Sequence, residues 1–241
     1  MDKADPQFIT KFVEEKYFED TKAGRIKFGT LKEYREYEGD VEARLGDSQE
    51  GICTEVVRGP IVNKTFKFGI IDARNITIDP RTTPVRSTLT YNAFIFCATT
   101  GNYDQQVHIN IQSKNPTLTH YVVFDLMRFQ KPIFNLFNHC PFKVEIYGGN
   151  VFYQPPEIFY DARNLSSDID PSRDMGKALE RQEMALFAKS PRFSYEKEYR
   201  ICAVPGWEKA KIIKPVFTKG FSKDIQNEFA SAVIGSGSLK L

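Results

Sequence analysis

The hydrophobic pattern at the N-terminal end of the chain predicts a helix, a strand and a second, short helix. Asp5-Pro6 is typical of a helix start, because Asp caps the first turn and Pro fits its first position. Apolar residues then recur at helical spacing, namely Phe8, Ile9, Phe12, Val13 and Tyr17. Gly24 favours the end of this helix. Residues 25–28 alternate as a strand does, and residues 31–37 predict a short helix.

Strand patterns dominate the middle of the chain. They follow an acidic stretch, residues 39–51, that is typical of a long loop. The apolar and aromatic run at residues 92–98 predicts a central strand, and Gly148-Gly149 predicts the turn of a hairpin. The other predicted strands are residues 54–62, 65–71, 73–78, 106–112 and 120–125, and the two arms of the hairpin at 143–147 and 150–153.

In the last third of the chain the period changes to that of a helix. This helix starts at Ser172 or Asp174, runs through Phe187 and ends before Pro191. The elements predicted after it are strands at 199–204 and 212–217, a helix at 223–232 and a last strand at 232–235. The sequence shows neither a repeat nor a clear linker. We therefore expect residues 1–241 to form a single α+β domain, with helices flanking a curved, mainly antiparallel sheet.

The composition excludes few classes of function. Of the 241 residues, 41% are hydrophobic and 27% are charged, which is ordinary for a globular protein. A net charge of +2 argues against a dedicated nucleic-acid coat but leaves a local basic groove open. Cations outnumber acids beyond Pro191, whereas residues 36–50 are acidic. This asymmetry either orients an anionic substrate or reflects a solvated, lysine-rich face.

The cysteines and histidines do not form a pattern typical of a metal site. The four cysteines contain no Cys-x-x-Cys pair and the three histidines have no partner at ligand spacing, so we expect no metal. Cys97 and Cys202 lie in apolar runs and are predicted to be buried free thiols. The sequence shows neither a signal peptide nor a membrane-spanning apolar run. We therefore expect a cytoplasmic protein without a membrane partner.

Two carboxylates close together, Glu196 and Glu198, are the sharpest chemical signal in the chain. Two residues apart at the mouth of a predicted strand, they are expected to point to the same side. Like charges so close either raise one pKa or require a cationic partner. The alternative is an exposed strand end at which Arg192 and Arg200 neutralise both acids.

Several segments, taken in order, resemble the ADP-ribosyltransferase superfamily. A polar early strand within residues 24–35 is followed by a Gly-Asp-x-x-Glu-Gly loop at residues 46–51. A strand that ends in Thr99 and Thr100 comes next, and Tyr-Glu-x-Glu-Tyr-Arg at residues 195–200 comes last. Most of the chain is also similar in outline to bacterial phage-defence toxins of toxin–antitoxin–chaperone systems, which ADP-ribosylate messenger RNA.

The resemblance implies an ADP-ribosyltransferase-like fold and a growth-arresting toxin. Such a toxin transfers ADP-ribose from NAD to a macromolecule, RNA or protein, and is held in check by an antitoxin. Glu198 would stabilise the cationic sugar, and Glu196 would contact or activate the acceptor. Thr99 and Thr100 would support the nicotinamide pocket.

The same resemblance implies a set of residues that bind the dinucleotide. Its pyrophosphate would pair with a cation on or near the early strand: Arg25, Lys27 or Arg35. Its nicotinamide ring would stack on Tyr34 or Tyr195. The remaining residues of the early strand in this set are Phe28, Gly29 and Thr30. The charged residues expected to border the cleft are Arg44, Asp47, Glu50, Arg192 and Arg200.

Other interpretations stay open. The same fold also suits an NAD hydrolase or a degenerate sensor. A non-enzymatic module would bind nucleic acid or protein through the basic C-terminal portion. Arg44, Asp47 and Glu50 also fit an internal, salt-bridged loop cap. A metal-dependent nuclease would use the acidic residues Asp40, Glu42, Asp47 and Glu50.

Overall fold

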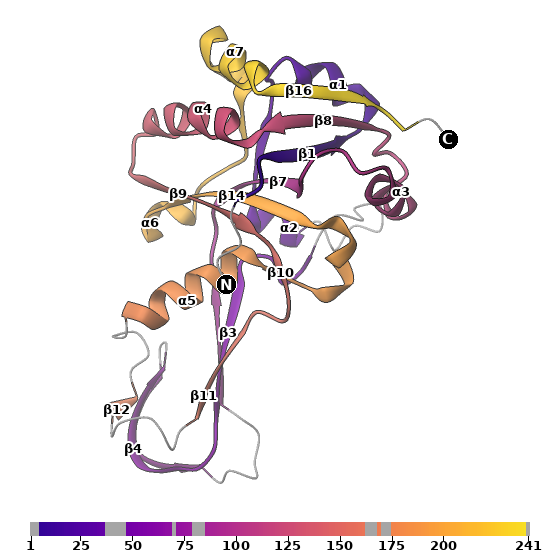
Figure 1. Cartoon of the computed structure of the whole chain (residues 1–241). Coiled ribbons are helices and arrows are strands. Elements are labelled where there is room, and N and C mark those ends of the chain that lie inside the picture. The colour runs from indigo at the N-terminus through magenta and orange to yellow at the C-terminus, as the bar shows by residue number, and fades with distance from the viewer. Residues whose placement is uncertain are drawn as a thin grey trace.

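The computed structural model describes residues 5–36, 47–68, 71–78, 85–161, 168–169 and 175–239. It shows an α+β protein whose strands are mostly antiparallel. An upper body of sheet and helices carries a narrow arm of strands that extends below it (Figure 1). Arg44, Asp40, Glu42 and the predicted starts of the late helix, Ser172 and Asp174, lie outside the described residues.

The upper body is built on an eight-stranded sheet. Its strands are β1 (Phe8–Val13), β2 (Lys27–Thr30), β7 (Phe94–Thr100), β8 (His120–Asp125), β9 (Val144–Asn150), β14 (Glu198–Pro205), β15 (Val216–Phe217) and β16 (Val233–Ser238). One path through the sheet runs β15-β2-β7-β1-β8-β16, while β14 pairs with β7 and with β9.

Helices cover both faces of this sheet. They are α1 (Glu15–Lys22), α2 (Leu31–Glu36), α3 (Gln105–Lys114), α4 (Leu126–Asn138), α5 (Met175–Phe187), α6 (Trp207–Ala210), α7 (Lys223–Ser231) and the 3-10 segments η4 (Pro191–Glu196) and η5 (Thr218–Gly220). In Figure 1, α4 and α7 lie above the strands β9 and β14, and α5 lies below them.

β7 joins the parts of the sheet. One edge of β7 pairs with β2 near Ile95 and with β1 at Thr99 and Thr100. The other edge pairs with β14 along its length, and Thr99 is the partner of Glu198. Because β7 and β14 are antiparallel, the end of one strand lies beside the start of the other. The hydroxyl residues and the glutamate therefore meet at the same end of the sheet.

The two faces of β14 bury different kinds of residue, because side chains alternate along a strand. On the first face Tyr199 packs with Phe96 and with residues of α4 and α7 in the aromatic core. On the second face Cys202 packs with residues of α2 and α5. Glu198 and Arg200 alternate in step with Cys202, so they lie on the second face, toward α5.

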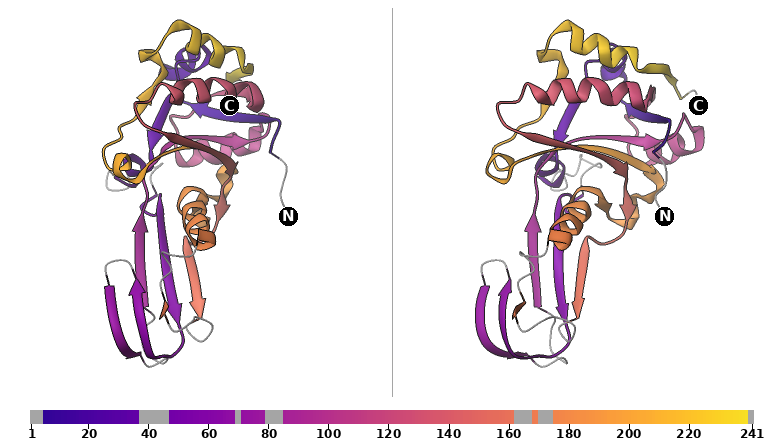
Figure 2. Two further views of the ribbon diagram at one scale, coloured as in Figure 1. Left: turned by 90° about the vertical axis from the view of Figure 1, so that its left-hand side faces the viewer. Right: turned by 60° about the vertical axis from the view of Figure 1, so that its left-hand side comes forward.

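The arm is made of two small sheets. Its strands are β3 (Ile52–Arg58), β4 (Ile61–Phe68), β5 (Ile71–Ile78), β6 (Val85–Thr90), β11 (Glu157–Asp161) and β12 (Asp168–Ile169). β3 pairs antiparallel with β6 and parallel with β11; β4 pairs antiparallel with β5 and parallel with β12. Both views in Figure 2 show these strands projecting away from the body. A short parallel pair, β10 (Phe152–Tyr153) with β13 (Ala188–Lys189), lies close to η4.

A buried polar network fixes α5 against the arm. Glu55 on β3 accepts hydrogen bonds from Tyr160 Oη at 2.6 Å and from Arg181 Nη1 at 3.0 Å. All three side chains are buried. Removing one member of such a network leaves a buried charge uncompensated, so the network holds α5 and its C-terminal extension in one position.

The prediction of a helix over the apolar positions from Phe8 is wrong in its first half. Phe8–Val13 is strand β1, and helix α1 begins only at Glu15. β1 is covered on both faces: Ile9 packs in the aromatic core, and Phe12 packs against α3. A strand buried on both faces loses the alternation that marks a half-exposed one. Its apolar positions at 8, 9, 12 and 13 therefore imitate helical spacing.

One further predicted strand and the predicted hairpin turn are wrong. Residues 106–112 belong to helix α3, whose N-cap Asp104 accepts from the backbone N–H of Gln106 and Val107. The hairpin at Gly148-Gly149 does not form, because β9 runs straight through both glycines and pairs them with β14. At Gly148 a Cβ atom would come within 2.8 Å of Tyr199 Oη, so glycine here permits close packing rather than a turn.

The remaining pattern holds in outline. The strands predicted at 92–98, 120–125 and 199–204 and the helix predicted at 223–232 are confirmed within a few residues by β7, β8, β14 and α7. Within the predicted strand at 212–217, only Val216–Phe217 is strand. β6 and α4 were not predicted; α4 carries Pro132 within it.

Candidate functional site

Five charged side chains meet on the second face of the sheet, at the start of β14. This carboxylate cluster consists of Glu50, Lys189, Glu196, Glu198 and Arg200. Its members come from the turn before β3, from β13, from the end of η4 and from β14. Segments far apart in the sequence therefore supply one site.

Glu198 is the centre of the cluster and is only 4% exposed. Its Oε1 accepts from Arg200 Nε at 2.6 Å, and its Oε2 accepts from Lys189 Nζ at 2.7 Å. Burial alone would raise the pKa of Glu198, but these two cations outweigh it and hold the pKa well below the usual range. Glu198 is therefore a carboxylate, and the alternative of an exposed strand end is wrong.

Glu196 reaches the same cation by a different route. It is the last residue of η4, and Lys197 follows it in the left-handed conformation, at φ 46°. This turn, rather than strand alternation, brings both carboxylates to one side, and Glu196 Oε2 lies 2.7 Å from Lys189 Nζ. Burial raises the pKa of Glu196 to about 7; the charge of Lys189 lowers it in part and that of Glu198 raises it further.

Arg200 links Glu198 to the third acid of the cluster, Glu50. Arg200 is fully buried, and its guanidinium donates from Nη2 to Glu50 Oε1 at 2.7 Å and from Nη1 to the Leu186 carbonyl at 2.8 Å. Glu50 Oε2 is buried and has no hydrogen-bond partner among the described residues. Burial is the main cause that raises the pKa of Glu50. An open acceptor in a buried site is a point at which a ligand hydroxyl can donate.

The loop before β3 has a structural role as well. Asp47 is buried; its Oδ1 accepts from Gln49 N and its Oδ2 from Ser190 N, both at 3.1 Å. These bonds tie the turn that carries Glu50 to the residue after Lys189. Asp47 therefore acts as an internal cap through backbone hydrogen bonds, whereas Glu50 forms its ion pairs within the cluster. Arg44, the third residue of the expected salt-bridged cap, lies outside the described residues.

Four residues of the cluster, all but Arg200, line a hollow of about 110 Å³ at the end of β7. Thr99 lies in its wall and donates from Oγ1 to the carbonyl of Glu196 at 3.0 Å, so it positions the turn that carries that acid. Tyr34 lines the hollow too, and burial raises its pKa well above the usual value. The other lining residues outside the cluster are Thr10, Lys11, Phe12, Cys97, Ala98, Ile111 and Leu118.

Two lysines of this site were missed in the sequence. Lys11 lies on β1, which the pattern assigned to a helix; its Nζ donates to the Cys97 carbonyl at 2.7 Å and lies 5.3 Å from the Phe96 ring centroid. Burial lowers the pKa of Lys11. Lys189 follows the late helix directly. Two neighbouring acids indicate that a cation lies close by, but the sequence does not show that this cation is Lys189.

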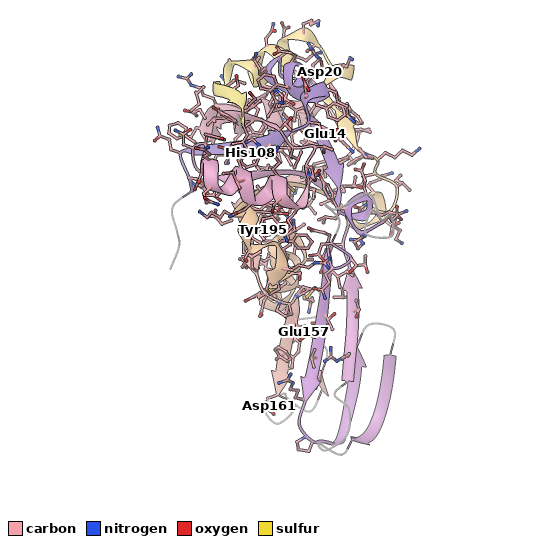
Figure 3. The ribbon with its side chains drawn as sticks, turned by 90° about the vertical axis from the view of Figure 1, so that its right-hand side faces the viewer. Glu14, Asp20, His108, Glu157, Asp161 and Tyr195 are labelled. Atoms are coloured by element: carbon pink, nitrogen blue, oxygen red, sulfur yellow. The ribbon has the colours of Figure 1, made fainter. Side chains whose placement is uncertain are left out.

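Most residues of the predicted early strand lie elsewhere. Arg25 pairs with Asp20 at 2.7 Å. Asp20 lies at the opposite end of the upper body from Tyr195 (Figure 3). Lys27 pairs with Glu33 at 2.5 Å, and Phe28 is fully buried in the aromatic core.

The next two residues of that strand shape the start of α2. Thr30 Oγ1 accepts from Glu33 N at 3.1 Å, and Glu33 Oε2 accepts from Thr30 N at 3.4 Å, which is a capping box. A Cβ atom at Gly29 would come within 2.7 Å of the Tyr34 ring. Glycine here lets the Tyr34 ring lie close against the backbone of β2.

The other predicted site residues that the structure describes do not line the hollow. Thr100 donates from Oγ1 to Asn150 Oδ1 at 2.7 Å. Tyr195 packs beside Phe12 and α3, and Figure 3 shows it below the helix that carries His108. Arg192 is exposed over the Phe193 ring, at 4.7 Å. Arg35 lines a separate cavity, and Arg44 lies outside the described residues.

No group of three or more His, Cys, Asp or Glu side chains among the described residues is placed to hold a metal ion. No helix in the described part of the chain is long and apolar enough to cross a membrane. Comparison of the chain with models of protein families, with curated proteins and with solved structures gave no match. The function therefore has to be argued from the chemistry of the carboxylate cluster.

Proposed function

We propose that the carboxylate cluster cleaves the bond between nicotinamide and ribose in NAD and passes ADP-ribose to a macromolecular acceptor. One observation carries the proposal: two neighbouring carboxylates at one hollow are pushed apart in ionisation, Glu198 to the anion and Glu196 to a pKa of about 7. Such a split assigns different roles to two acids of the same type. RNA as the acceptor and growth arrest as the outcome follow from the resemblance to phage-defence toxins.

Glu198 has the properties required of the charge-stabilising acid. As the bond from ribose C1′ to the nicotinamide nitrogen breaks, nicotinamide leaves with the bonding electrons and positive charge develops on the sugar. A fixed carboxylate beside the sugar stabilises this charge, and burial strengthens the effect. Lys189 and Arg200 hold the Glu198 carboxylate in place, so little reorganisation is needed during the reaction.

Glu196 suits the role of general base. The new bond forms between ribose C1′ and a hydroxyl or amino group of the acceptor, whose proton has to leave. A base whose pKa lies near the working pH accepts this proton most effectively. The proton then resides on Glu196 and is released to solvent, so the step needs no further reactant.

The hollow is suited to one end of the dinucleotide. Its volume of about 110 Å³ is smaller than the roughly 300–1,000 Å³ of pockets that enclose whole ligands, so only the nicotinamide riboside end would enter. The open acceptor Glu50 Oε2 suits a ribose hydroxyl, and the Tyr34 ring suits the face of nicotinamide. Lys11, which also lines the hollow, would meet the diphosphate; it takes the role that the resemblance assigned to Arg25, Lys27 or Arg35.

The test measures the transfer of a radiolabel from NAD to acceptor molecules. Purified protein is incubated with NAD carrying a radiolabelled adenylate phosphate, together with total RNA or total protein, and labelled acceptors are identified by mass spectrometry. We expect Glu198→Gln to lower the rate by about 10²–10³-fold with the fold retained. The matched control is Glu19→Gln on exposed α1, which should leave the rate unchanged.

Each other outcome has a distinct meaning. Full activity of the Glu198→Gln protein would show that the carboxylate cluster is not the catalytic site. Release of free ADP-ribose without any labelled acceptor would identify an NAD hydrolase of the same site. Binding of RNA with no consumption of NAD, unchanged by Glu198→Gln, would identify a non-enzymatic binding module.

A further inference from the structure

A second cavity lies at the other end of the β7–β14 pair. Its volume is about 530 Å³, and it is lined by Asn92 before β7, by Val204 and Pro205 at the end of β14, and by residues of α2, α5, α6 and β9. α6 and β9 mark its place at the left of Figure 1. Because β14 rises by roughly 3.4 Å per residue, Val204 lies about 20 Å from Glu198. The cavity is therefore separate from the hollow at the carboxylate cluster.

The walls of this cavity carry an excess of positive charge. Lys32, Arg35, Lys143 and Lys211 line it, against one acid, Glu145. Glu145 is already engaged: it accepts from Tyr147 Oη at 2.7 Å and from Lys143 Nζ at 3.0 Å, and the first of these bonds is the main cause that lowers its pKa. Low-dielectric walls focus the field of the surrounding cations. The cavity is thus suited to an anionic ligand.

Arg35 gives part of this charge a fixed position, and Lys32 adds a mobile charge beside it. Arg35 Nη1 donates to the carbonyls of Glu50 and Tyr91, so two backbone groups hold its guanidinium. An anchored, planar guanidinium loses little entropy when it binds phosphate. Lys32 pairs with Glu36 at 3.6 Å, but both side chains are more than half exposed and such a pair is weak.

The volume of the cavity and its uncharged lining residues indicate which chemical group the anionic ligand carries. A cavity of about 530 Å³ falls within the range of pockets that hold small ligands. Val204, Pro205 and Ala210 form an apolar wall, with Tyr91 beside it, that suits a planar ring. The amide of Gln182 offers both a donor and an acceptor for the edge of such a ring.

From these features we infer that the cavity between α2, α6 and the ends of β9 and β14 binds a nucleoside phosphate. The cations hold the phosphate and the apolar wall holds the base. The same chemical unit is present in a free nucleotide and in a strand of RNA, and the experiment separates the two sources. The inference does not depend on the proposed reaction, because it concerns a different cavity and is tested by binding alone.

The experiment compares two variants of equal charge change. The cavity variant carries Lys32→Glu, Lys143→Glu and Lys211→Glu. The control variant carries Lys131→Glu, Lys219→Glu and Lys223→Glu, three lysines that are also exposed but lie on α4, η5 and α7 and do not line the cavity. Both are built in the full-length chain, and NAD is absent from the assay, so that no turnover accompanies binding.

The probes are AMP and ATP, measured by calorimetry, and a fluorescent single-stranded RNA of about twelve nucleotides, measured by anisotropy over a range of salt. We expect the cavity variant to bind at least tenfold more weakly than the control variant. For RNA, the slope of log affinity against log salt should also become shallower by about 0.7 for each phosphate that the variant no longer neutralises. Circular dichroism and thermal melts show whether both variants are folded.

The pattern of results decides the question. Weaker binding of AMP and ATP by the cavity variant alone identifies a free-nucleotide site. Weaker binding of RNA alone, with no binding of the mononucleotides, identifies a site for a nucleic-acid strand. Equal weakening by both variants, or no binding of any probe to the parent protein, overturns the inference. If the cavity variant does not fold, Gln182→Ala with Lys211→Ala tests the same walls without charge reversal.

Discussion

The carboxylates of Glu196 and Glu198 share one ammonium group, because Lys189 Nζ lies 2.7 Å from Oε2 of each. Glu50 Oε1 lies 3.8 Å from the same nitrogen and 2.7 Å from Arg200 Nη2. Three acids therefore meet two cations in a buried site. With little water to screen them, these groups influence each other's ionisation. Burial raises the pKa of Glu196, which Lys189 lowers only in part, whereas Arg200 and Lys189 together outweigh burial and lower the pKa of Glu198.

Replacing Lys189 with Met should destabilise the protein strongly. Removing one partner of a buried ion pair leaves an uncompensated charge and costs about 3–5 kcal/mol in the free energy of unfolding. Urea denaturation measures this loss. The control is Lys16→Met. The Lys16 side chain is 63% exposed and pairs with Glu14, so its loss should cost about 0–1 kcal/mol in the free energy of unfolding.

A second substitution separates charge from packing at this position. Adding Glu196→Gln to Lys189→Met removes one of the acids that lost its cation, so part of the stability should return. If Lys189→Met alone leaves the unfolding curve unchanged, the lysine does not balance the cluster. If the double variant is no more stable than the single one, lost packing rather than charge accounts for the effect.

The pH dependence of activity should report Glu196. The pKa of Glu196 is raised to about 7, chiefly by burial, and only its carboxylate form can accept a proton. The rate should therefore rise with pH through about 7. Initial rates measured across this range show the limb, and Glu196→Gln should lower the rate and abolish the limb. A rising limb that persists unchanged in Glu196→Gln would assign it to another group.

The same group should make stability depend on pH in the opposite direction. Its pKa is about 7 in the folded chain and roughly 4.3 when unfolded, so the folded state binds the proton more tightly. The stability that this proton contributes is complete below about pH 4.3 and is lost as the pH rises to about 7. Glu196→Gln cannot ionise and should lack this decline, as thermal melts of both proteins would show.

The sequence predicted the strands that carry the site better than the site itself. β7, β8 and β14 were recognised because aromatic and β-branched residues fill them. β1 was not, because it is buried on both faces and its apolar residues imitate helical spacing. With β1 predicted as a helix, Lys11 lies on no predicted strand, and the resemblance implies Arg25, Lys27 or Arg35 in its place, none of which lines the hollow.

The cluster depends on tertiary contacts that spacing does not reveal. Glu196 and Glu198 were singled out from sequence, but the expected reason, alternation along a strand, was wrong; the left-handed turn at Lys197 brings them together. Lys189 meets both acids across that turn, and Glu50 arrives from a loop far away in the chain. Only the fold places these residues side by side.

The turn at Lys197 leads to a prediction about backbone strain. Lys197 has φ 46°, a region that costs a residue with a side chain about 1–3 kcal/mol and that a β-branched residue rarely adopts. Lys197→Gly should keep activity and stability, whereas Lys197→Val should lower both by displacing Glu196. Chemical denaturation and rate measurements on the two variants, both of which lack the lysine charge, isolate the backbone effect. Equal behaviour of Gly and Val at this position would show that the turn does not position Glu196.

Arg200→Lys tests whether the shape of the guanidinium, and not its charge alone, organises the site. Arg200 donates from Nε to Glu198, from Nη2 to Glu50 and from Nη1 to the Leu186 carbonyl, three directions fixed by one planar group. Lysine keeps the charge but cannot span these three acceptors with that geometry. A hydrogen bond to a charged group is worth about 1.5–3 kcal/mol, so we expect clearly lower stability where such bonds are broken.

The effect of Arg200→Lys on activity should exceed that of a change in stability alone. A less firmly held Glu198 stabilises the developing charge less well, so kcat should fall by at least about tenfold while the KM for NAD changes little. Rates taken well below the unfolding temperature of the variant separate the two effects. Arg25→Lys, at the solvent-accessible pair with Asp20, is the control and should change neither quantity. An Arg200→Lys protein with unchanged kcat would show that charge alone suffices to hold Glu198.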